Sequence, residues 1–168
     1  WFDWDVLSTS YNKYKDINLE TEISNTRVKE IVNELEYAIS LYRGDFMEND
    51  LYEQWLEIPR VSYRQMMLNL VMILAKVLYY LGENNKALEY LEYGIDEEAY
   101  REDFYLLAMK ILNEENRFWE VAFLYKKCKN IMEKELGILP SKRLKLEYNK
   151  LTKNLEKPTN SGSKHQAS

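Results

Sequence analysis

The chain has 168 residues, of which 46% are hydrophobic and 30% are charged, so it can build the core of one domain of ordinary size. Five Gly and three Pro are too few for a sheet with many tight turns, and this scarcity favours helices. The net charge of −5 conceals an acidic body, because residues 1–120 carry 12 Lys and Arg against 24 Asp and Glu. Such a body repels phosphate, which excludes it as a nucleic-acid surface.

Apolar residues recur every three or four positions along most of the chain, which predicts a succession of helices. A helix over residues 1–15 should pack on a second one over residues 26–42, which Gly44 ends. A short helix follows, and Pro59 begins the next one, because proline fits the first turn of a helix.

The helix over residues 59–81 contains the most apolar run of the sequence. Asn69 and Lys76 interrupt that run, so it predicts a buried helix rather than a membrane span, and Val61 should face inward. Further helices are expected over residues 84–94, 96–112 and 117–135, and Gly137 should end the third of them. The last helix should open at Pro140 and Ser141. The domain is therefore predicted over residues 1–156, and the Ser-, Thr- and Gly-containing residues 157–168 read as a disordered tail.

The cysteine content bears on the cellular compartment of the protein. The first residue bears on whether the sequence is a fragment. Cys128 is the single cysteine, so no disulfide forms within the chain, and no secretory signal is visible. We therefore expect a cytoplasmic protein without a membrane anchor. Because the sequence begins with Trp1 rather than Met, we expect a fragment of a longer chain.

An internal repeat emerges when residues 75–94 are aligned with residues 109–128, an offset of 34 residues. Lys76 then matches Lys110. At the turn Gly82 matches Asn116, the other residue type that tolerates left-handed backbone. Two antiparallel helices with this period are typical of tetratricopeptide repeats. We expect an all-α fold of about seven helices, whose hairpins stack as a short right-handed solenoid with a concave groove.

The concave groove of such a stack is lined by the first helix of each hairpin and can capture an extended peptide or a small ligand. Aromatic and polar side chains on these helices are candidate groove residues, although ordinary packing or surface exposure is the simpler interpretation. A ligand- or peptide-sensing groove of a signalling protein is one candidate function. The candidates are Tyr79, Tyr80, Tyr105 and Asn113.

Two segments about 90 residues apart, LYRGDF at 41–46 and ELGILPS at 135–141, resemble the opening and the close of the bacterial transcriptional activator domain. The resemblance covers roughly residues 1–155. Glu97 stands where the family has proline, and Asn116 stands where it has glycine, which weakens the expected turn geometry. The residues that carry the resemblance are Leu41, Tyr42, Arg43, Gly44, Asp45, Trp55, Arg60, Gly137 and Pro140.

The resemblance implies a regulatory role. Such domains follow a winged-helix DNA-binding domain in regulators of the antibiotic regulatory protein type, and they mediate dimerisation and contacts with protein partners, including the transcription machinery. DNA would then be read only by a domain absent from this chain. We expect Trp55 to anchor a junction between hairpins, and Arg43 or Arg60 to form a buried charge-assisted hydrogen bond.

Enzyme chemistry is not indicated by the sequence. His165 is the only histidine and lies in the predicted tail, so no histidine-based triad or metal site can form. Cys128 aligns with Gly94 in the repeat and should be a small buried packing residue. No glycine-rich phosphate loop is present. We therefore expect no catalytic residue, no metal and no cofactor.

The C-terminal part of the domain differs in charge from the rest. Residues 121–157 carry 10 Lys and Arg against 4 Asp and Glu. This segment could attract nucleic acid, but its lysines are not interleaved with stacking aromatic residues, so a solvated helix face is the simpler interpretation.

Overall fold

A computed structural model describes residues 2–20, 24–42 and 57–153 of the chain. These residues form seven α-helices and no strand, which confirms the predicted all-α fold. The helices are α1 Phe2–Tyr14, α2 Asn25–Ser40, α3 Glu57–Tyr80, α4 Asn84–Glu97, α5 Glu102–Glu114, α6 Phe118–Ile131 and α7 Lys142–Thr152, and a π-helical turn, η2 Met132–Leu136, follows α6.

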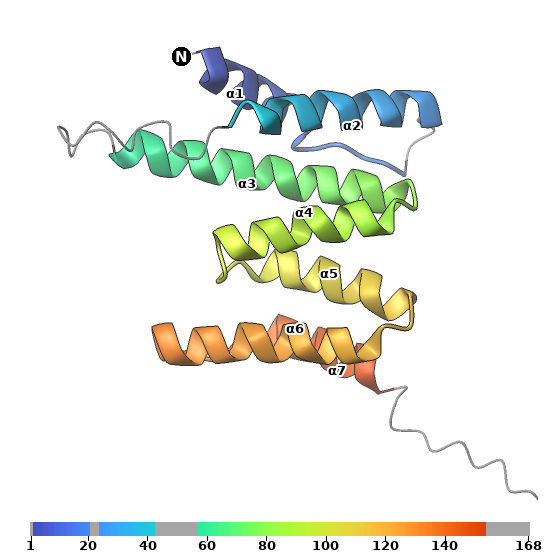
Figure 1. Ribbon diagram of the computed structural model, residues 1–168, viewed down its shortest axis with the longest axis vertical. Helices are drawn as coiled ribbons and strands as arrows, with labels where there is room; N and C mark the ends of the chain where they lie inside the picture. Colours follow the sequence, from blue (N-terminus) through green and yellow to red (C-terminus); the bar gives the residue numbers. More distant parts are fainter. Residues whose placement is uncertain (1, 21–23, 43–56, 154–168) are drawn as a thin grey trace, which may run out of the picture.

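Consecutive helices pack against one another from α2 to α6, as a stack of hairpins requires (Figure 1). Helix α1 contacts both α2 and α3 at one end of the stack, while α7 contacts α5 and α6 at the other. Helix α5 also contacts α3, so alternate helices meet on one side of the stack. The predicted tetratricopeptide-like arrangement is therefore present.

The two repeat turns have the same backbone. Gly82 has φ 78° and Asn116, 34 residues later, has φ 61°, so both residues adopt the left-handed conformation predicted for them. After each, the next amide donates to a carbonyl five residues earlier: Glu83 to Leu78 at 2.9 Å and Arg117 to Leu112 at 2.8 Å. This is the hydrogen bond of a Schellman helix end, and it makes both chain reversals alike.

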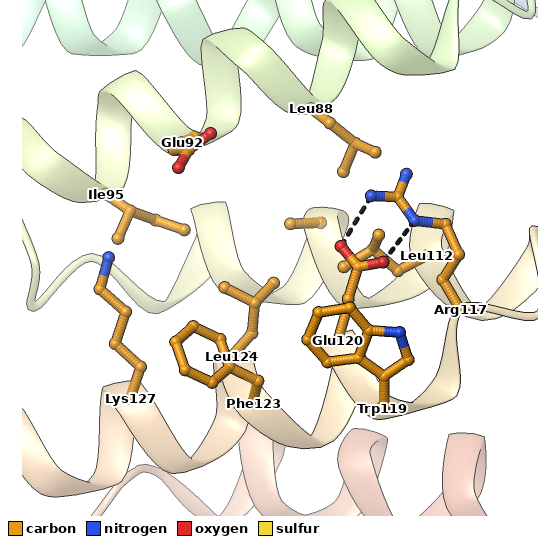
Figure 2. A pocket seen from close by; sticks show the side chains of 11 residues that line it. Leu88, Glu92, Ile95, Leu112, Arg117, Trp119, Glu120, Phe123, Leu124 and Lys127 are labelled. Carbon is orange, nitrogen blue, oxygen red and sulfur yellow. Dashed lines mark hydrogen bonds and ion pairs between the residues drawn. The ribbon is translucent and has the colours of Figure 1, made fainter.

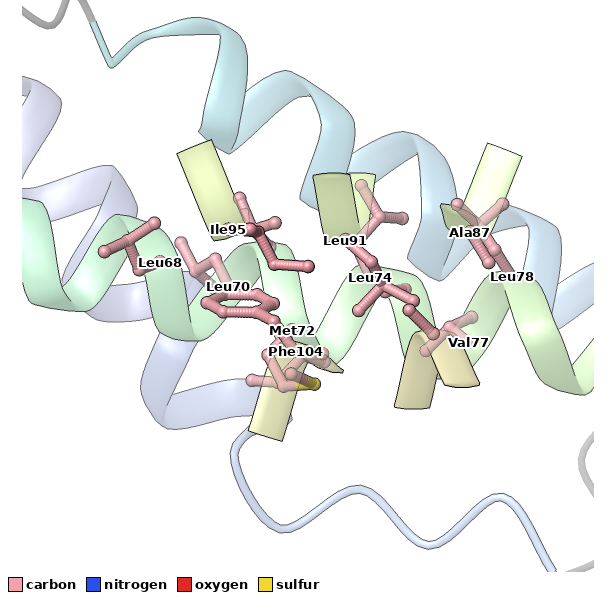
Figure 3. Close-up of a cluster of buried hydrophobic side chains, with 14 of the residues drawn as sticks. Leu68, Leu70, Met72, Leu74, Val77, Leu78, Ala87, Leu91, Ile95 and Phe104 are labelled. Carbon is pink, nitrogen blue, oxygen red and sulfur yellow. The ribbon is translucent and has the colours of Figure 1, made fainter. Parts of the chain in front are cut away.

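The close packing of the hairpins depends on small residues at helix crossings. Gly94 on α4 is buried, and the ring of Phe104 on α5 lies directly against its backbone. Phe104 is fully buried and reaches the cluster that contains Met72 and Ile95 (Figure 3). Cys128, the repeat equivalent of Gly94, is also fully buried, as predicted, and its thiol lies 3.7 Å from the sulfur of Met132.

Several predicted details were wrong. Helix α5 begins at Glu102 rather than near residue 96, because residues 98–101 form the hydrogen-bonded reversal between α4 and α5. Helix α2 spans Asn25–Ser40 rather than residues 26–42, and its N-cap is Ser24, whose hydroxyl accepts the amide of Arg27 at 3.3 Å. Val61 was expected inside, yet 61% of it is exposed because the packed face of α3 begins further along the helix.

Helix α3 carries the apolar run discussed above. Its segment Val61–Tyr80 is long and apolar enough to cross a membrane by length and mean hydropathy, 1.2. However, residues such as Leu70, Val71 and Leu74 are fully buried against α1, α2 and α4. Packing inside the stack therefore accounts for the apolar character of α3, as predicted.

Candidate functional site

The four predicted groove residues do not form a site together. Tyr105 is fully buried and its hydroxyl donates to the carbonyl of Ala99 at 3.0 Å, so this prediction is corrected: Tyr105 is a core residue. Burial raises its pKa. Tyr105 lies on the inner face of α5 because α4 and α6 stack on either side of that helix. The residue type alone does not reveal this position.

Tyr79, Tyr80 and Asn113 lie near the turn end of α3 and α5. The hydroxyl of Tyr79 donates to both carboxylate oxygens of Glu114, at 2.7 and 2.8 Å, and the ammonium of Lys110 lies 5.2 Å from its ring centroid. Tyr80 is exposed and Asn113 is half-buried. None of the three lines either of the grooves found along the described helices.

The family-motif residues are only partly visible. Leu41 and Tyr42 directly follow α2, and the ring of Tyr42 stacks on that of Tyr63 with centroids 5.2 Å apart. Gly137 has φ 65° and ends η2, as predicted, while Pro140 precedes Ser141, the N-cap of α7. Outside the described residues lie Arg43, Gly44, Asp45, Trp55 and the side chain of Arg60.

A groove of about 310 Å³ runs between α4 and α6, with α5 as its floor (Figure 2). Its apolar lining comes from all three helices. Two large aromatic side chains of α6 stand beside it: Trp119 is 73% exposed and Phe123 is 60% exposed. The apolar lining residues are Leu88, Ile95, Ala108, Leu112 and Leu124. We call this surface the α4–α6 groove.

Charged pairs stand at both ends of the α4–α6 groove. At one end the guanidinium of Arg117 donates two hydrogen bonds to the carboxylate of Glu120, at 2.7 and 2.6 Å, and a third to Glu115 at 3.1 Å. The hydrogen bonds with Glu120 raise the pKa of Arg117, and they lower the pKa of Glu120. At the other end Lys127 lies 3.4 Å from Asp96. An apolar cleft with charged ends suits an apolar partner segment whose polar groups reach the rim.

Sequence reasoning did not single out Trp119 and Phe123. A signal was present, because these residues are four apart and therefore share one face of a helix. Val121 and Cys128, which are buried, occupy the opposite face of the same helix. An apolar pair off the packed face of an amphipathic helix indicates a surface that another molecule covers.

No group of three His, Cys, Asp or Glu side chains that could hold a metal ion occurs within residues 2–20, 24–42 and 57–153. The fold and the α4–α6 groove define a helical-hairpin scaffold with an apolar, aromatic-flanked surface. That is the class of protein to which the geometry assigns this chain.

Comparison with known families narrows the class. The family model described as Bacterial transcriptional activator domain matches residues 17–152, well over half of the chain. The chain therefore belongs to the bacterial transcriptional activator domain family. This is a family of transcription regulators and not a family of enzymes. A comparison with curated proteins gave no match.

Proposed function

We propose that this domain mediates self-association of a bacterial transcriptional regulator, and that the α4–α6 groove is the contact surface. The observation that carries the proposal is the pair Trp119 and Phe123, which stand largely in solvent beside an apolar groove. Large aromatic side chains are costly to leave in water, and they dominate the energetics of protein interfaces.

A second copy of the chain is the occupant that this surface favours. Closed dimers use the same patch on both subunits, so the patch must be complementary to itself. The α4–α6 groove combines protruding rings with a recess that rings can fill, and both signs of charge occur at its rim. Two copies related by a two-fold axis can therefore each insert Trp119 and Phe123 beside the other's groove.

The acidic charge of residues 1–120 supports the proposal that this domain contacts proteins and that another domain of the regulator contacts DNA. Residues 1–120 have a net charge of −12, which opposes contact with phosphate groups. DNA contact is therefore assigned to a domain outside this chain, and the present domain contacts proteins, including other domains of the regulator and the transcription machinery. A cytoplasmic location follows from this role.

Sedimentation velocity tests the proposal. The chain should show a concentration-dependent dimer, and the double substitution Trp119→Ser with Phe123→Ser should weaken dimerisation at least tenfold, the size of a hot-spot loss. A matched control is Tyr37→Ser with Tyr80→Ser, since these side chains are 57% and 46% exposed but lie outside the groove. A chain that stays monomeric at all concentrations, or a Trp119 and Phe123 variant that dimerises normally, would refute the proposal.

A further inference from the structure

A second groove, of about 350 Å³, lies on the face formed by α3, α5 and α7. Met72, Leu106 and Leu107 supply its apolar part. On α5, Leu106 and Leu107 point to one side of the helix, whereas Ala108 and Leu112, which line the α4–α6 groove, point to the opposite side. We call this second surface the α3–α5–α7 groove, and it is separate from the surface proposed for self-association.

Three cations line the α3–α5–α7 groove, one from each helix: Lys76, Lys110 and Arg143. All three are exposed, and within the described part of the chain none forms an ion pair. The ammonium of Lys110 lies over the ring of Tyr79, a cation–π contact that leaves it without a carboxylate partner. The 34-residue repeat places Lys110 at the position equivalent to Lys76, and Arg143 follows 33 residues after Lys110.

The carboxylates of the same groove already have partners. Asp103 accepts hydrogen bonds from Arg101 at 3.2 and 2.7 Å, and Glu147 lies 3.2 Å from Lys150. The charge in the groove that has no partner is therefore positive. In contrast, the first 120 residues of the chain have a net charge of −12. An acidic ligand is repelled by most of this surface and attracted to the groove.

The spacing of the cations selects an extended ligand. Helix α5 contacts both α3 and α7, and contacting helices lie about 8–10 Å apart, so successive cations repeat on the order of 10 Å. A peptide in the extended polyproline II conformation advances about 3.1 Å per residue with three residues per turn, so side chains three residues apart share one face and repeat at about the same distance. Carboxylates at positions i, i+3 and i+6 would each meet one cation.

We propose that the α3–α5–α7 groove binds an extended acidic peptide whose carboxylates at every third residue pair with Lys76, Lys110 and Arg143. Met72, Leu106 and Leu107 receive the apolar side chains between the carboxylates. A peptide is favoured over nucleic acid because the described groove offers no aromatic ring for base stacking and holds two carboxylates among its cations. This activity goes beyond self-association and uses the other side of α5.

Fluorescence anisotropy with a labelled nine-residue peptide tests the proposal. The probe carries glutamate at positions 1, 4 and 7 and leucine or serine elsewhere, and a second peptide of the same composition carries its three glutamates side by side. The probe should bind the chain more tightly than the second peptide. Each of Lys76→Gln, Lys110→Gln and Arg143→Gln should weaken binding by about 3-fold, and the triple variant by tenfold or more.

The matched control is the triple variant Lys29→Gln, Lys126→Gln and Lys145→Gln, which removes the same charge from exposed positions outside the groove. It should change the affinity by less than about twofold. Far-UV circular dichroism should show that both triple variants remain folded, and sedimentation should show unchanged self-association.

Four results would overturn the proposal. These are absence of probe binding, equal affinity for the two peptides, and equal weakening by the control variant, which would indicate unspecific charge attraction. The fourth is tighter binding of a single-stranded oligonucleotide of equal charge, which would assign the groove to nucleic acid.

Discussion

The ring of Phe104 lies so close to the backbone of Gly94 that a β-carbon at position 94 would overlap the ring. Both residues are buried, so the ring has no room to move away. The contact joins α4 of one hairpin to α5 of the next. Stacking of the two hairpins thus depends on the absence of a side chain at position 94.

Gly94→Ala should destabilise the chain by about 1–3 kcal/mol, the usual cost of overpacking a core. Phe104→Leu removes ring atoms from the contact, so Gly94→Ala should destabilise the Phe104→Leu variant less than it destabilises the unchanged chain. Urea unfolding of the two single variants and the double variant measures the coupling, expected at about 0.5–3 kcal/mol. If the effects of the two single substitutions are strictly additive in the double variant, Gly94→Ala does not destabilise the chain through the ring of Phe104.

The two left-handed turn residues should respond in opposite ways to substitution. A β-carbon at Gly82 would meet no atom within 4 Å, so Gly82→Ala strains only the backbone and should cost about 1 kcal/mol. Asn116→Gly relieves the same strain and should leave stability equal or slightly higher, whereas Asn116→Ala should lower it. Thermal unfolding measures these changes, and a loss on Asn116→Gly equal to that of Asn116→Ala would contradict the backbone explanation.

Two helix caps offer a matched comparison. Ser24 and Ser141 both accept an amide of their own helix, at 3.3 and 3.2 Å, but Ser141 also donates its amide and its hydroxyl to the carboxylate of Glu102 on α5. Ser24→Ala should cost about 1 kcal/mol, and Ser141→Ala should cost more because it also weakens the contact with α5. When Glu102 is also replaced by Ala, Ser141→Ala should destabilise the chain no more than Ser24→Ala does, as measured by urea unfolding. If Ser141→Ala still costs more in that variant, Glu102 is not the partner responsible.

Cys128 should report on unfolding. Its side chain is fully buried, and burial raises the pKa of its thiol to about 11, so iodoacetamide at pH 8 should not modify the native chain. Alkylation should become fast in urea, with a midpoint equal to that seen by circular dichroism. Rapid alkylation of the native chain would place the thiol at the surface instead.

The same thiol should link stability to alkaline pH. Its pKa rises from 9.0 in the unfolded chain to about 11 in the folded chain, so the folded state holds the proton more tightly. The stabilisation that the protonated, buried thiol gives the folded state is complete below pH 9 and is lost as pH rises from about 9 to 11. The stability difference between the chain and its Cys128→Ala variant should therefore shrink over that range, as measured by urea unfolding at each pH. A constant difference would mean that the thiol has an ordinary pKa.

Local pattern predicted those parts of the fold that depend on a few neighbouring residues. The 34-residue offset identified Gly82 and Asn116 as equivalent turns because left-handed backbone demands glycine or asparagine. Gly137 and Ser141 were identified for the same kind of reason, since helix ends have residue preferences of their own. Helix boundaries were less well predicted at α5, where the chain reverses without a strong breaker.

The candidate sites were not predictable in the same way. Tyr105 was assigned to a groove and lies in the core, while Trp119 and Phe123 were passed over and lie in solvent. Residue type indicates that an aromatic ring prefers an apolar neighbour, but not whether that neighbour is another helix of the chain or a separate molecule.

By itself the sequence determined an all-helical chain, the equivalence of two hairpins and membership of the bacterial transcriptional activator domain family, because these are recorded in periodicity, turn residues and motifs. Only the tertiary structure decided which faces of the hairpins remain uncovered. Each groove is lined by helices from different hairpins, so its existence depends on how the hairpins stack. The contact of Phe104 with Gly94 helps to set that stacking, and no local pattern contains it.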